Sequence, residues 1–185
     1  PSEPPFAEGP SFPLYLEGQR GWSRLLMAPV RGASAPAAVE RRSREVVRID
    51  GVYLDALQWT EASPAQVQRN RSISGECLAM GPRPVFRRGL GTCAPSRIVY
   101  GIPEGHTTLA ATIGCQREAA MYGSVVFVVE ADGKELFRSP VLHRGSTPIE
   151  VRVPVGGASQ LTLVLEDAGD GPSYDHANWA DARFL

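Results

Sequence analysis

Lysine is nearly absent from this 185-residue sequence: Lys134 is the single lysine, and the other 18 of the 19 basic residues are arginines. The formal net charge at pH 7 is only −1, so the chain lacks the basic excess with which a protein neutralises nucleic-acid phosphates. No apolar run approaches the roughly 20 residues that a membrane-spanning helix needs. We therefore expect neither a nucleic-acid partner nor a transmembrane segment.

Sequence motifs of the common catalytic sites are also missing. There is no G-x-S-x-G nucleophile elbow, no H-E-x-x-H zinc motif, no phosphate-binding loop and no dinucleotide fingerprint. The histidines His106, His143 and His176 are scattered along the chain. Two carboxylates can hydrolyse a glycosidic bond, but the chain is small for a glycosidase. We expect no enzyme activity.

Proline divides the chain into two zones. Residues 1–48 hold seven of the sixteen prolines, and proline removes a backbone donor and fixes φ, so no long helix or strand can form there. The sequence begins at Pro1, which is expected of a processed protein or of a fragment. We predict a Pro-rich extended N-terminal arm or linker over 1–48 and a folded domain over 49–185. The arm is either a disordered linker or, because it also contains Trp22 and several Phe and Leu residues, a segment that packs on a partner or on its own domain.

Short apolar runs separated by turn residues fill the second zone. Val125–Val129 is apolar on both faces, as expected of a central strand, and Asp132-Gly133 is a hairpin signal. Such spacing predicts an all-β fold, an antiparallel β-sandwich. The candidate strands cover residues 52–60, 97–100, 107–113, 124–131, 135–138, 149–153, 161–165 and 179–184.

Five segments in a fixed order carry a family resemblance. The tail from Asp167 to Ala182 reads D-x-G-D-G-x-x-x-D-H-A-x-W-A-D-A. Together with four earlier segments, it resembles the NPCBM family, the novel putative carbohydrate-binding modules. The other four are Y-L-D-A-L-Q-W-T (53–60), R-G-L-G-T-C-A-P-S (88–96), G-S-V-V-F (123–127) and D-G-K (132–134).

This resemblance implies a fold and a function. The fold would be a galactose-binding-like jelly roll, and the function that of a non-catalytic bacterial carbohydrate-binding module for galactose-type or cell-surface glycans. The protein would be secreted, periplasmic or located on the cell surface. Two departures support an alternative: Cys93 stands where the family has His, and Gln116 and Arg117 stand where it has aspartates. The alternative is an accessory or structural subunit of a larger assembly, docked through its N-terminal arm, with the sugar site degenerate.

A sugar site needs aromatic faces for C–H surfaces and planar polar groups for hydroxyls. For Trp179 we also keep open a role in core packing, because Ala180 and Ala182 flank it. The candidate ligand-binding residues near loops are Glu118, Tyr122, Arg88, Tyr174, His176, Asn178 and Trp179.

Calcium is the cofactor that the resemblance implies. Many galactose-binding-like sandwiches hold a structural calcium where the first and last strands meet, and there Asp181 would be the ligand and Asp55 a helper. Asp170 and Asp175 lie in a Gly-rich acidic loop that could also wrap an ion. The alternative is that the loop aspartates cap turns and that Asp181 pairs with an arginine.

The three cysteines leave two alternatives. Cys93 and Cys115 fall in two of the motif loops, and a disulfide between them would imply an oxidising compartment, with Cys77 unpaired. Otherwise all three are thiols that behave as small apolar residues.

Overall fold

The computed structural model describes residues 51–63, 66–82, 85–118 and 123–185. The predicted arm over 1–48 and the candidate ligand residue Tyr122 lie outside these ranges. The predicted boundary between arm and domain therefore stays a prediction.

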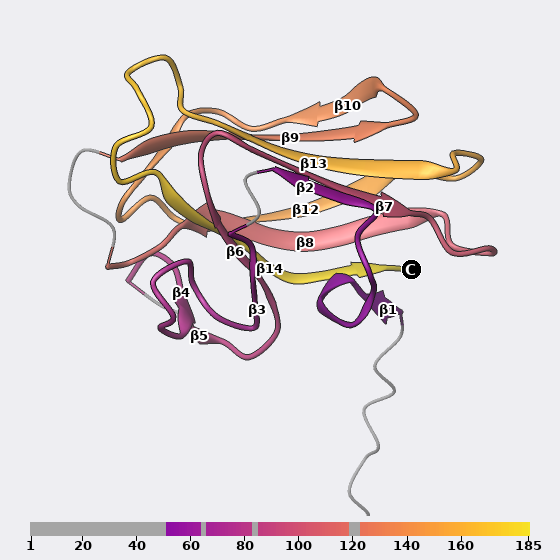
Figure 1. Cartoon of the computed structure of the whole chain (residues 1–185), viewed down its shortest axis with the longest axis horizontal. Helices are drawn as coiled ribbons and strands as arrows, with labels where there is room; N and C mark the ends of the chain where they lie inside the picture. The colour runs from indigo at the N-terminus through magenta and orange to yellow at the C-terminus, as the bar shows by residue number, and fades with distance from the viewer. Residues whose placement is uncertain (1–50, 64–65, 83–84, 119–122) are drawn as a thin grey trace, which may run out of the picture. The chain divides into compact units, whose positions relative to one another are not determined.

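Two antiparallel sheets face each other in the described domain (Figure 1). In the first sheet β14 lies at the centre and β1 (Val52–Tyr53) pairs with its C-terminal end. The main path of this sheet runs β12 (Ile149–Pro154), β8 (Thr108–Cys115), β14 (His176–Phe184), β6 (Gly89–Cys93) and β3 (Gln68–Arg69).

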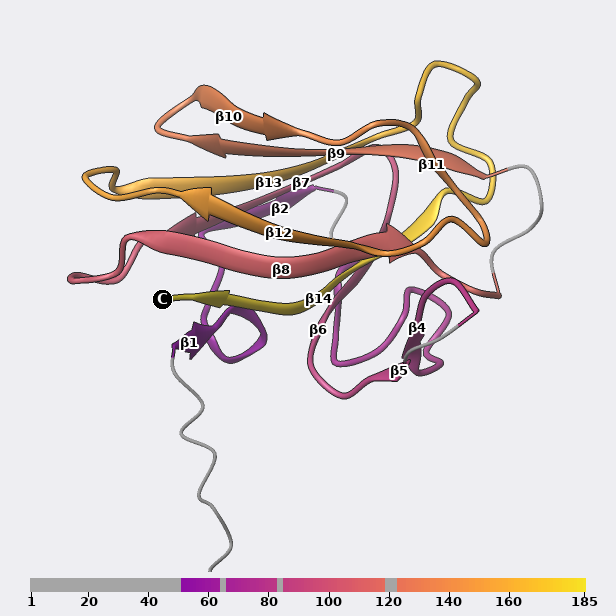
Figure 2. The ribbon, with the colours of Figure 1, turned by 180° about the vertical axis from the view of Figure 1, so that it is seen from behind.

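The second sheet covers the opposite side of the core (Figure 2). A short strand, β11 (Leu142–His143), pairs with the start of β9, and a separate hairpin is formed by β4 (Leu78–Ala79) and β5 (Val85–Phe86). The predicted all-β antiparallel sandwich is thus confirmed. The main path runs β10 (Lys134–Arg138), β9 (Ser124–Ala131), β13 (Gln160–Glu166), β7 (Ser96–Gly101) and β2 (Glu61–Ser63).

Alternation along each strand decides which side chains fill the core. On β12, Val151 and Val153 are buried while Glu150 and Arg152 are exposed, the pattern of a strand with one face in water. The two sheets meet where the rings of Phe127 and Trp179 pack edge to face, with centroids 4.8 Å apart. Aromatic pairs in this arrangement stabilise beyond the area that they bury.

The opening segment differs from its prediction. Residues 52–60 do not form one strand: β1 ends at Tyr53, a 3₁₀ turn η2 (Leu54–Ala56) follows, and β2 begins at Glu61. The chain has to cross between the sheets here, because Val52 pairs with Phe184 in one sheet and Glu61 with Val99 in the other. The first and last strands meet, as the resemblance implied, through the pairs Val52–Phe184 and Tyr53–Arg183.

Glycines of the R-G-L-G segment let another part of the chain cross β6 closely. A Cβ atom added at Gly91 would stand 2.3 Å from the carbonyl oxygen of Arg71. At Gly89, where φ is +138°, an added Cβ would stand 2.4 Å from the carbonyl oxygen of Trp179. Any side chain at either position would push β6 away from its neighbours.

Strand β14 contains a β-bulge. Its register against β8 shifts between Ala180 and Arg183, and Asp181 there adopts a left-handed φ of +48°. The extra residue changes which residues face inward: Trp179 and Ala182 are both in the core. Within the described residues, no helix is long and apolar enough to cross a membrane.

Candidate functional site

A buried glutamine organises one end of the sandwich, which we call the loop end and define by residues 77–82, 116–118 and 170–176. Gln116 follows β8 directly and is fully buried. Its Oε1 accepts hydrogen bonds from Ala79 N (3.2 Å) and from the side-chain amide of Asn178. Its Nε2 donates to Cys77 O (3.0 Å) and to the Glu118 carboxylate. Gln116 therefore ties the β4–β5 hairpin and Glu118 to the last strand.

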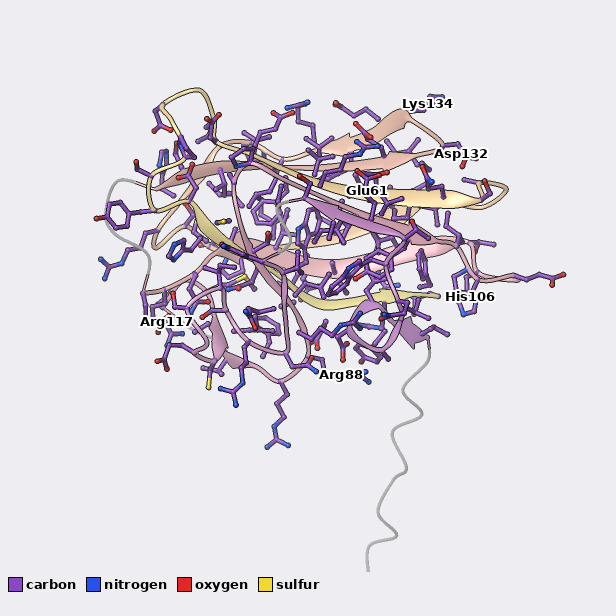
Figure 3. All side chains as sticks on the ribbon, in the orientation of Figure 1. Glu61, Arg88, His106, Arg117, Asp132 and Lys134 are labelled. Atoms are coloured by element: carbon purple, nitrogen blue, oxygen red, sulfur yellow. The ribbon has the colours of Figure 1, made fainter. Side chains whose placement is uncertain are left out.

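Arg117 adds two contacts to the same hairpin. Its backbone N–H donates to Ala79 O (2.7 Å) and its Nε donates to Gly81 O (3.0 Å). Figure 3 shows Arg117 far from His106, at the opposite end of the described domain. The two residues that replace the family's aspartates, Gln116 and Arg117, thus hold the hairpin in place.

The acidic loop before β14 closes on the start of β9. Ser124 donates from its backbone N–H to Asp175 Oδ1 (2.8 Å) and from its hydroxyl to Asp170 Oδ2 (2.7 Å). Asp175 is 1% exposed, and its Oδ2 has no hydrogen-bond partner. Desolvation by burial, with a smaller contribution from Asp170 and Asp167, raises the pKa of Asp175 to about 6. Asp167 caps its own turn by accepting from Gly169 N (3.1 Å).

Three predicted ligand residues lie in or beside this loop end. Glu118 is exposed, Tyr174 is 58% exposed and His176 is half-buried. The chain links them, because Gln116 N donates to His176 O (2.9 Å) and His176 N donates to Tyr174 O (2.8 Å). Burial lowers the pKa of His176 below its usual value, which favours the neutral imidazole.

Two predicted ligand residues are internal, so their prediction is wrong. Asn178 is fully buried and donates to Gln116, and it therefore acts on the loop end from beneath. Trp179 is 1% exposed and packs on Phe127, which agrees with the alternative that Trp179 packs in the core. Neither side chain can touch a ligand in this structure, because each points away from solvent.

Arg88 does not join the loop end either. Its Nη2 lies 2.9 Å from Asp55 Oδ2, and its guanidinium lies 3.8 Å from the ring centroid of Tyr53. Figure 3 shows Arg88 and Arg117 on separate parts of the domain. The structure therefore gives Arg88 a role in fixing the opening segment.

The four predicted metal ligands fall into two pairs. Burial raises the pKa of Asp181 above its usual value; Arg183 and Arg88 counteract this shift, and Asp55 makes a smaller contribution that raises the pKa. Two arginines lie at the pair of Asp55 and Asp181: Arg88 binds Asp55 Oδ2, and Arg69 Nη1 donates to the backbone oxygens Asp55 O (2.5 Å) and Leu57 O (2.7 Å). The positive charge of Arg88 competes with a cation for Asp55, but the other carboxylate oxygen of Asp55, Oδ1, is buried without a hydrogen-bond partner. A calcium ion at Asp55 and Asp181 therefore stays a prediction.

Asp170 and Asp175 fit a cation better, because the buried Oδ2 of Asp175 has no partner, whereas Arg88 already neutralises the Asp55 carboxylate. Calcium takes six to eight oxygen ligands. In the described part of the chain, no three His, Cys, Asp or Glu side chains are grouped so as to hold a metal ion. An ion at this loop would therefore also need backbone or water oxygens.

The predicted Cys93–Cys115 disulfide is not formed, because all three cysteines are free thiols. Cys93 pairs with His176 on one side of β14, and Cys115 pairs with Ala177 on the other side. The two cysteines are therefore separated by two strand spacings of about 4.8 Å each. Their separation exceeds roughly 7 Å, the largest distance between Cα atoms that a disulfide tolerates. Cys115 instead donates to Leu142 O (3.2 Å), and burial raises its pKa to about 12.

Gln116 and Arg117 organise the loop end, a role that was not predicted from the sequence, where they stand only as replacements of two aspartates. A signal was present: the polar pair Gln116-Arg117 follows the predicted strand 107–113 after only Gly114 and Cys115. Their partners in the β4–β5 hairpin are 36 to 39 residues away, so the sequence could not identify those contacts.

Comparison with known proteins identifies the domain. The model of the family described as "NPCBM/NEW2 domain" matches residues 50–185. Two curated relatives are 32% identical: a "Putative endo-alpha-N-acetylgalactosaminidase" of Renibacterium salmoninarum and "Alpha-1,3-galactosidase B" of Akkermansia muciniphila. The matches cover 72% and 70% of this chain. The chain spans only 9% and 17% of the length of these relatives.

Solved structures agree with the family match. A CBM51 from Clostridium perfringens GH95, solved in complex with methyl-galactose, is 31% identical with a TM-score of 0.68, and the match covers 73% of this chain and 99% of that one. A structure of the CBM51-2 and INT domains of Clostridium perfringens ZmpB, with GlcNAc, is 30% identical with the same TM-score, and the match covers 72% of this chain and 31% of that one. The predicted resemblance is confirmed: the chain belongs, through residues 50–185, to the NPCBM/NEW2 domain family.

Proposed function

We propose that this domain is a non-catalytic carbohydrate-binding module that recognises a galactose-type sugar at its loop end. The observation that carries the proposal is the 31% identity to a CBM51 solved with methyl-galactose, which the chain matches over 99% of that module. Binding of glycans suggests a place outside the cell, secreted or on a surface. The curated relatives are named as enzymes and are much longer than this chain, which is consistent with a module that accompanies catalysis elsewhere.

Glu118 is the first candidate for contact with the sugar. Its side chain is exposed, and Gln116 Nε2 donates to one of its carboxylate oxygens. A carboxylate held by a buried amide is oriented before a ligand arrives, and this lowers the entropic cost of binding. Tyr174, more than half exposed, offers an aromatic face, and His176 a planar polar group.

One observation favours the alternative of an accessory or structural subunit with a degenerate sugar site. The polar atoms of Gln116 and the Nε of Arg117 are already used within the chain. Fewer groups at the loop end remain available to a sugar than two aspartates would supply.

Calcium is proposed as a structural ion only at the acidic loop. Asp170 and Asp175 would hold it, and its charge would compensate the buried, unpartnered Oδ2 of Asp175. In a metal-free buffer, added Ca²⁺ should raise the melting temperature of the wild type but not of Asp175→Asn. Equal melting temperatures with and without Ca²⁺ in the wild type would contradict the proposal.

Titration calorimetry with methyl-galactose tests the sugar site. We expect Glu118→Gln to weaken binding about tenfold or more, since it removes one charged hydrogen bond to a hydroxyl, worth roughly 1.5–3 kcal/mol. Glu104→Gln is the matched control, because Glu104 is exposed in the loop that leads to His106, at the far end of the domain. Absence of binding to methyl-galactose and to GlcNAc would overturn the sugar site and favour the subunit.

A further inference from the structure

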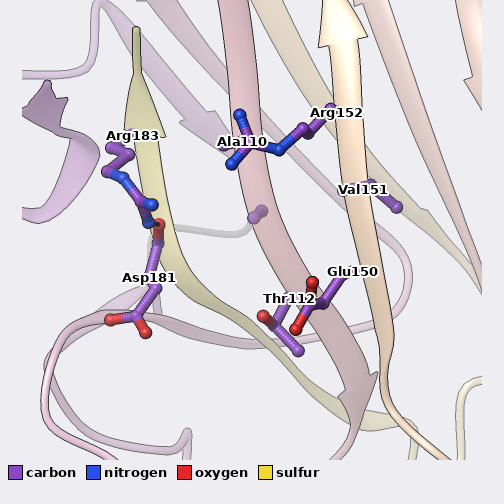
Figure 4. Close-up of a pocket in the computed structure, with 8 residues that line it drawn as sticks. Ala110, Thr112, Glu150, Val151, Arg152, Asp181 and Arg183 are labelled. Atoms are coloured by element: carbon purple, nitrogen blue, oxygen red, sulfur yellow. Dashed lines mark hydrogen bonds between the residues drawn. The ribbon is translucent and has the colours of Figure 1, made fainter. Parts of the chain in front are cut away.

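The outer face of the first sheet carries a small polar hollow that no part of the loop end contributes to. Its volume is about 170 Å³, below the roughly 300 Å³ at which pockets for drug-sized ligands begin, so it suits one sugar ring rather than a chain. Figure 4 shows its side chains coming from three neighbouring strands, β12, β8 and β14. The residues that define it here are Ala110, Thr112, Glu150, Arg152, Asp181 and Arg183.

Strand register places two arginines on either side of one alanine. Ala110 on β8 pairs with Arg152 on β12 and with Arg183 on β14. Directly opposed residues have Cβ atoms about 5 Å apart, so both guanidinium groups can reach over the methyl group of Ala110. Figure 4 shows the Arg152 guanidinium lying over this position, with Arg183 on the other side.

An acidic row lies two residues further along β8. Thr112 pairs with Glu150, and Asp181 lines the hollow from β14. Residues two apart on a strand are separated by about 6.8 Å, close to the width of a sugar ring. The hollow therefore has a cationic end over Ala110 and an anionic end beside Thr112 (Figure 4).

The β-bulge in β14 builds the cationic end. Ala182 and Phe184 face the core and Arg183 lies opposite Ala110. Without the extra residue, the two-residue alternation from Trp179 would turn Arg183 into the core. Bulges re-aim side chains and are over-represented next to functional sites.

Most polar groups of the hollow are available to a ligand. The side chains of Glu150 and Arg152 and the carboxylate of Asp181 have no hydrogen bond or ion pair with any other residue that the structure describes. Arg183 is held in place, because its Nη1 donates to Asp181 O (3.0 Å) and its guanidinium lies 5.6 Å from the ring centroid of Tyr53. One arginine is thus fixed and the other free to close on a ligand.

We propose that this hollow binds a single acidic sugar residue, a ring that carries a carboxylate. The sugar carboxylate lies between Arg152 and Arg183, whose planar guanidinium groups match its two oxygens. Ring hydroxyls donate to Glu150 and Asp181. This site is separate from the loop end and does not depend on the galactose-type site proposed there.

Heteronuclear NMR on the full chain tests the proposal, with sodium glucuronate as the probe and glucose as its neutral counterpart. Glucuronate should shift the amide signals of Ala110, Thr112 and Arg152 in a saturable way, and glucose should bind at least tenfold more weakly. Arg152→Ser should weaken glucuronate binding tenfold or more. Lys134→Ser is the matched control, because it removes one exposed positive charge from the other sheet.

Each outcome decides the proposal. Retained binding in Glu118→Gln together with lost binding in Arg152→Ser supports a separate acidic-sugar site. Equal affinity for glucose and glucuronate overturns the role of the carboxylate. Shifts confined to Glu118, Tyr174 and His176, or an Arg152→Ser variant that binds like the wild type, overturn the site itself. The galactose-type site is tested separately with methyl-galactose, so the failure of one proposal can be distinguished from the failure of the other.

Discussion

Arg88 and Asp55 form an ion pair of 2.9 Å that joins the opening segment to the residue before β6. The Asp55 side chain is only 4% exposed, whereas that of Arg88 is 37% exposed. The same guanidinium lies on the Tyr53 ring, and the backbone oxygen of Arg88 accepts from Asp181 N (3.0 Å). One residue therefore connects the turn after β1 to the bulge of the closing strand.

Arg88→Leu should destabilise the fold and leave sugar binding unchanged. Removal of Arg88 leaves a buried carboxylate without its cation. We expect a loss of about 1–3 kcal/mol in the free energy of unfolding, which is less than for a fully buried ion pair because Arg88 is partly exposed. Urea denaturation measures the loss. Asp55→Asn combined with Arg88→Leu should cost less than the sum of the two single changes; a simple sum would mean that the pair does not interact.

Trp179→Ala should cost stability and not specificity. Among the residues that the structure describes, Trp179 is the largest fully buried side chain, and it packs edge to face on Phe127. Its truncation therefore opens a cavity between the sheets, at a cost of about 3–5 kcal/mol. Trp179→Phe should cost less because it keeps an aromatic ring in place. If the folded Phe variant loses methyl-galactose affinity, Trp179 contributes to the sugar site and the burial argument fails.

The fold was predictable from the sequence where a single strand shows a clear run or alternation of apolar residues. Val125–Val129 is apolar throughout, and the 149–153 segment alternates, and both are strands as predicted. The opening segment was predicted wrongly because it crosses from one sheet to the other, with its start paired to β14 and its end leading into β2. The short strand β3 and the β4–β5 hairpin were missed because each strand is two residues long, too short for any periodicity.

The site was less predictable than the fold. Asn178 and Trp179 are polar and aromatic residues in the family motif, yet both lie inside the sandwich, and only the position of β14 at the centre of its sheet explains this. The polar hollow depends on a one-residue bulge at Asp181. A shift of one residue changes the face of every later side chain, and nothing in the local sequence marks it.

Thiol reactivity should distinguish the three cysteines. Cys77 is exposed, Cys93 is half-buried with its pKa raised by burial, and Cys115 is buried with a pKa of about 12. Because the thiolate is the reactive form, a thiol reagent at pH 8 should modify Cys77 first and Cys115 only on unfolding. The intact mass should be the same with and without reductant; a gain of about two mass units on reduction would reveal a disulfide.

Asp175 should make the stability of the domain depend on pH between about 4 and 6. Burial raises the pKa of Asp175 to about 6 in the folded state, against 3.8 for an ordinary aspartate side chain. The folded state therefore binds the proton more tightly than the unfolded state. The contribution of this group is fully present below about pH 4 and is lost as the pH rises through 6.

Asp175→Asn removes this titration while its side-chain oxygen can still accept from Ser124 N. We expect the stability difference, variant minus wild type, to increase from pH 4 to pH 7 by up to about 3 kcal/mol, at roughly 1.4 kcal/mol per pKa unit. Denaturation series in calcium-free buffer at both pH values measure it. Burial also lowers the pKa of His176, but His176 titrates in the variant as it does in the wild type. The stability difference between the two proteins therefore reports on Asp175. A difference that stays constant with pH would mean that Asp175 keeps an ordinary pKa in the folded state.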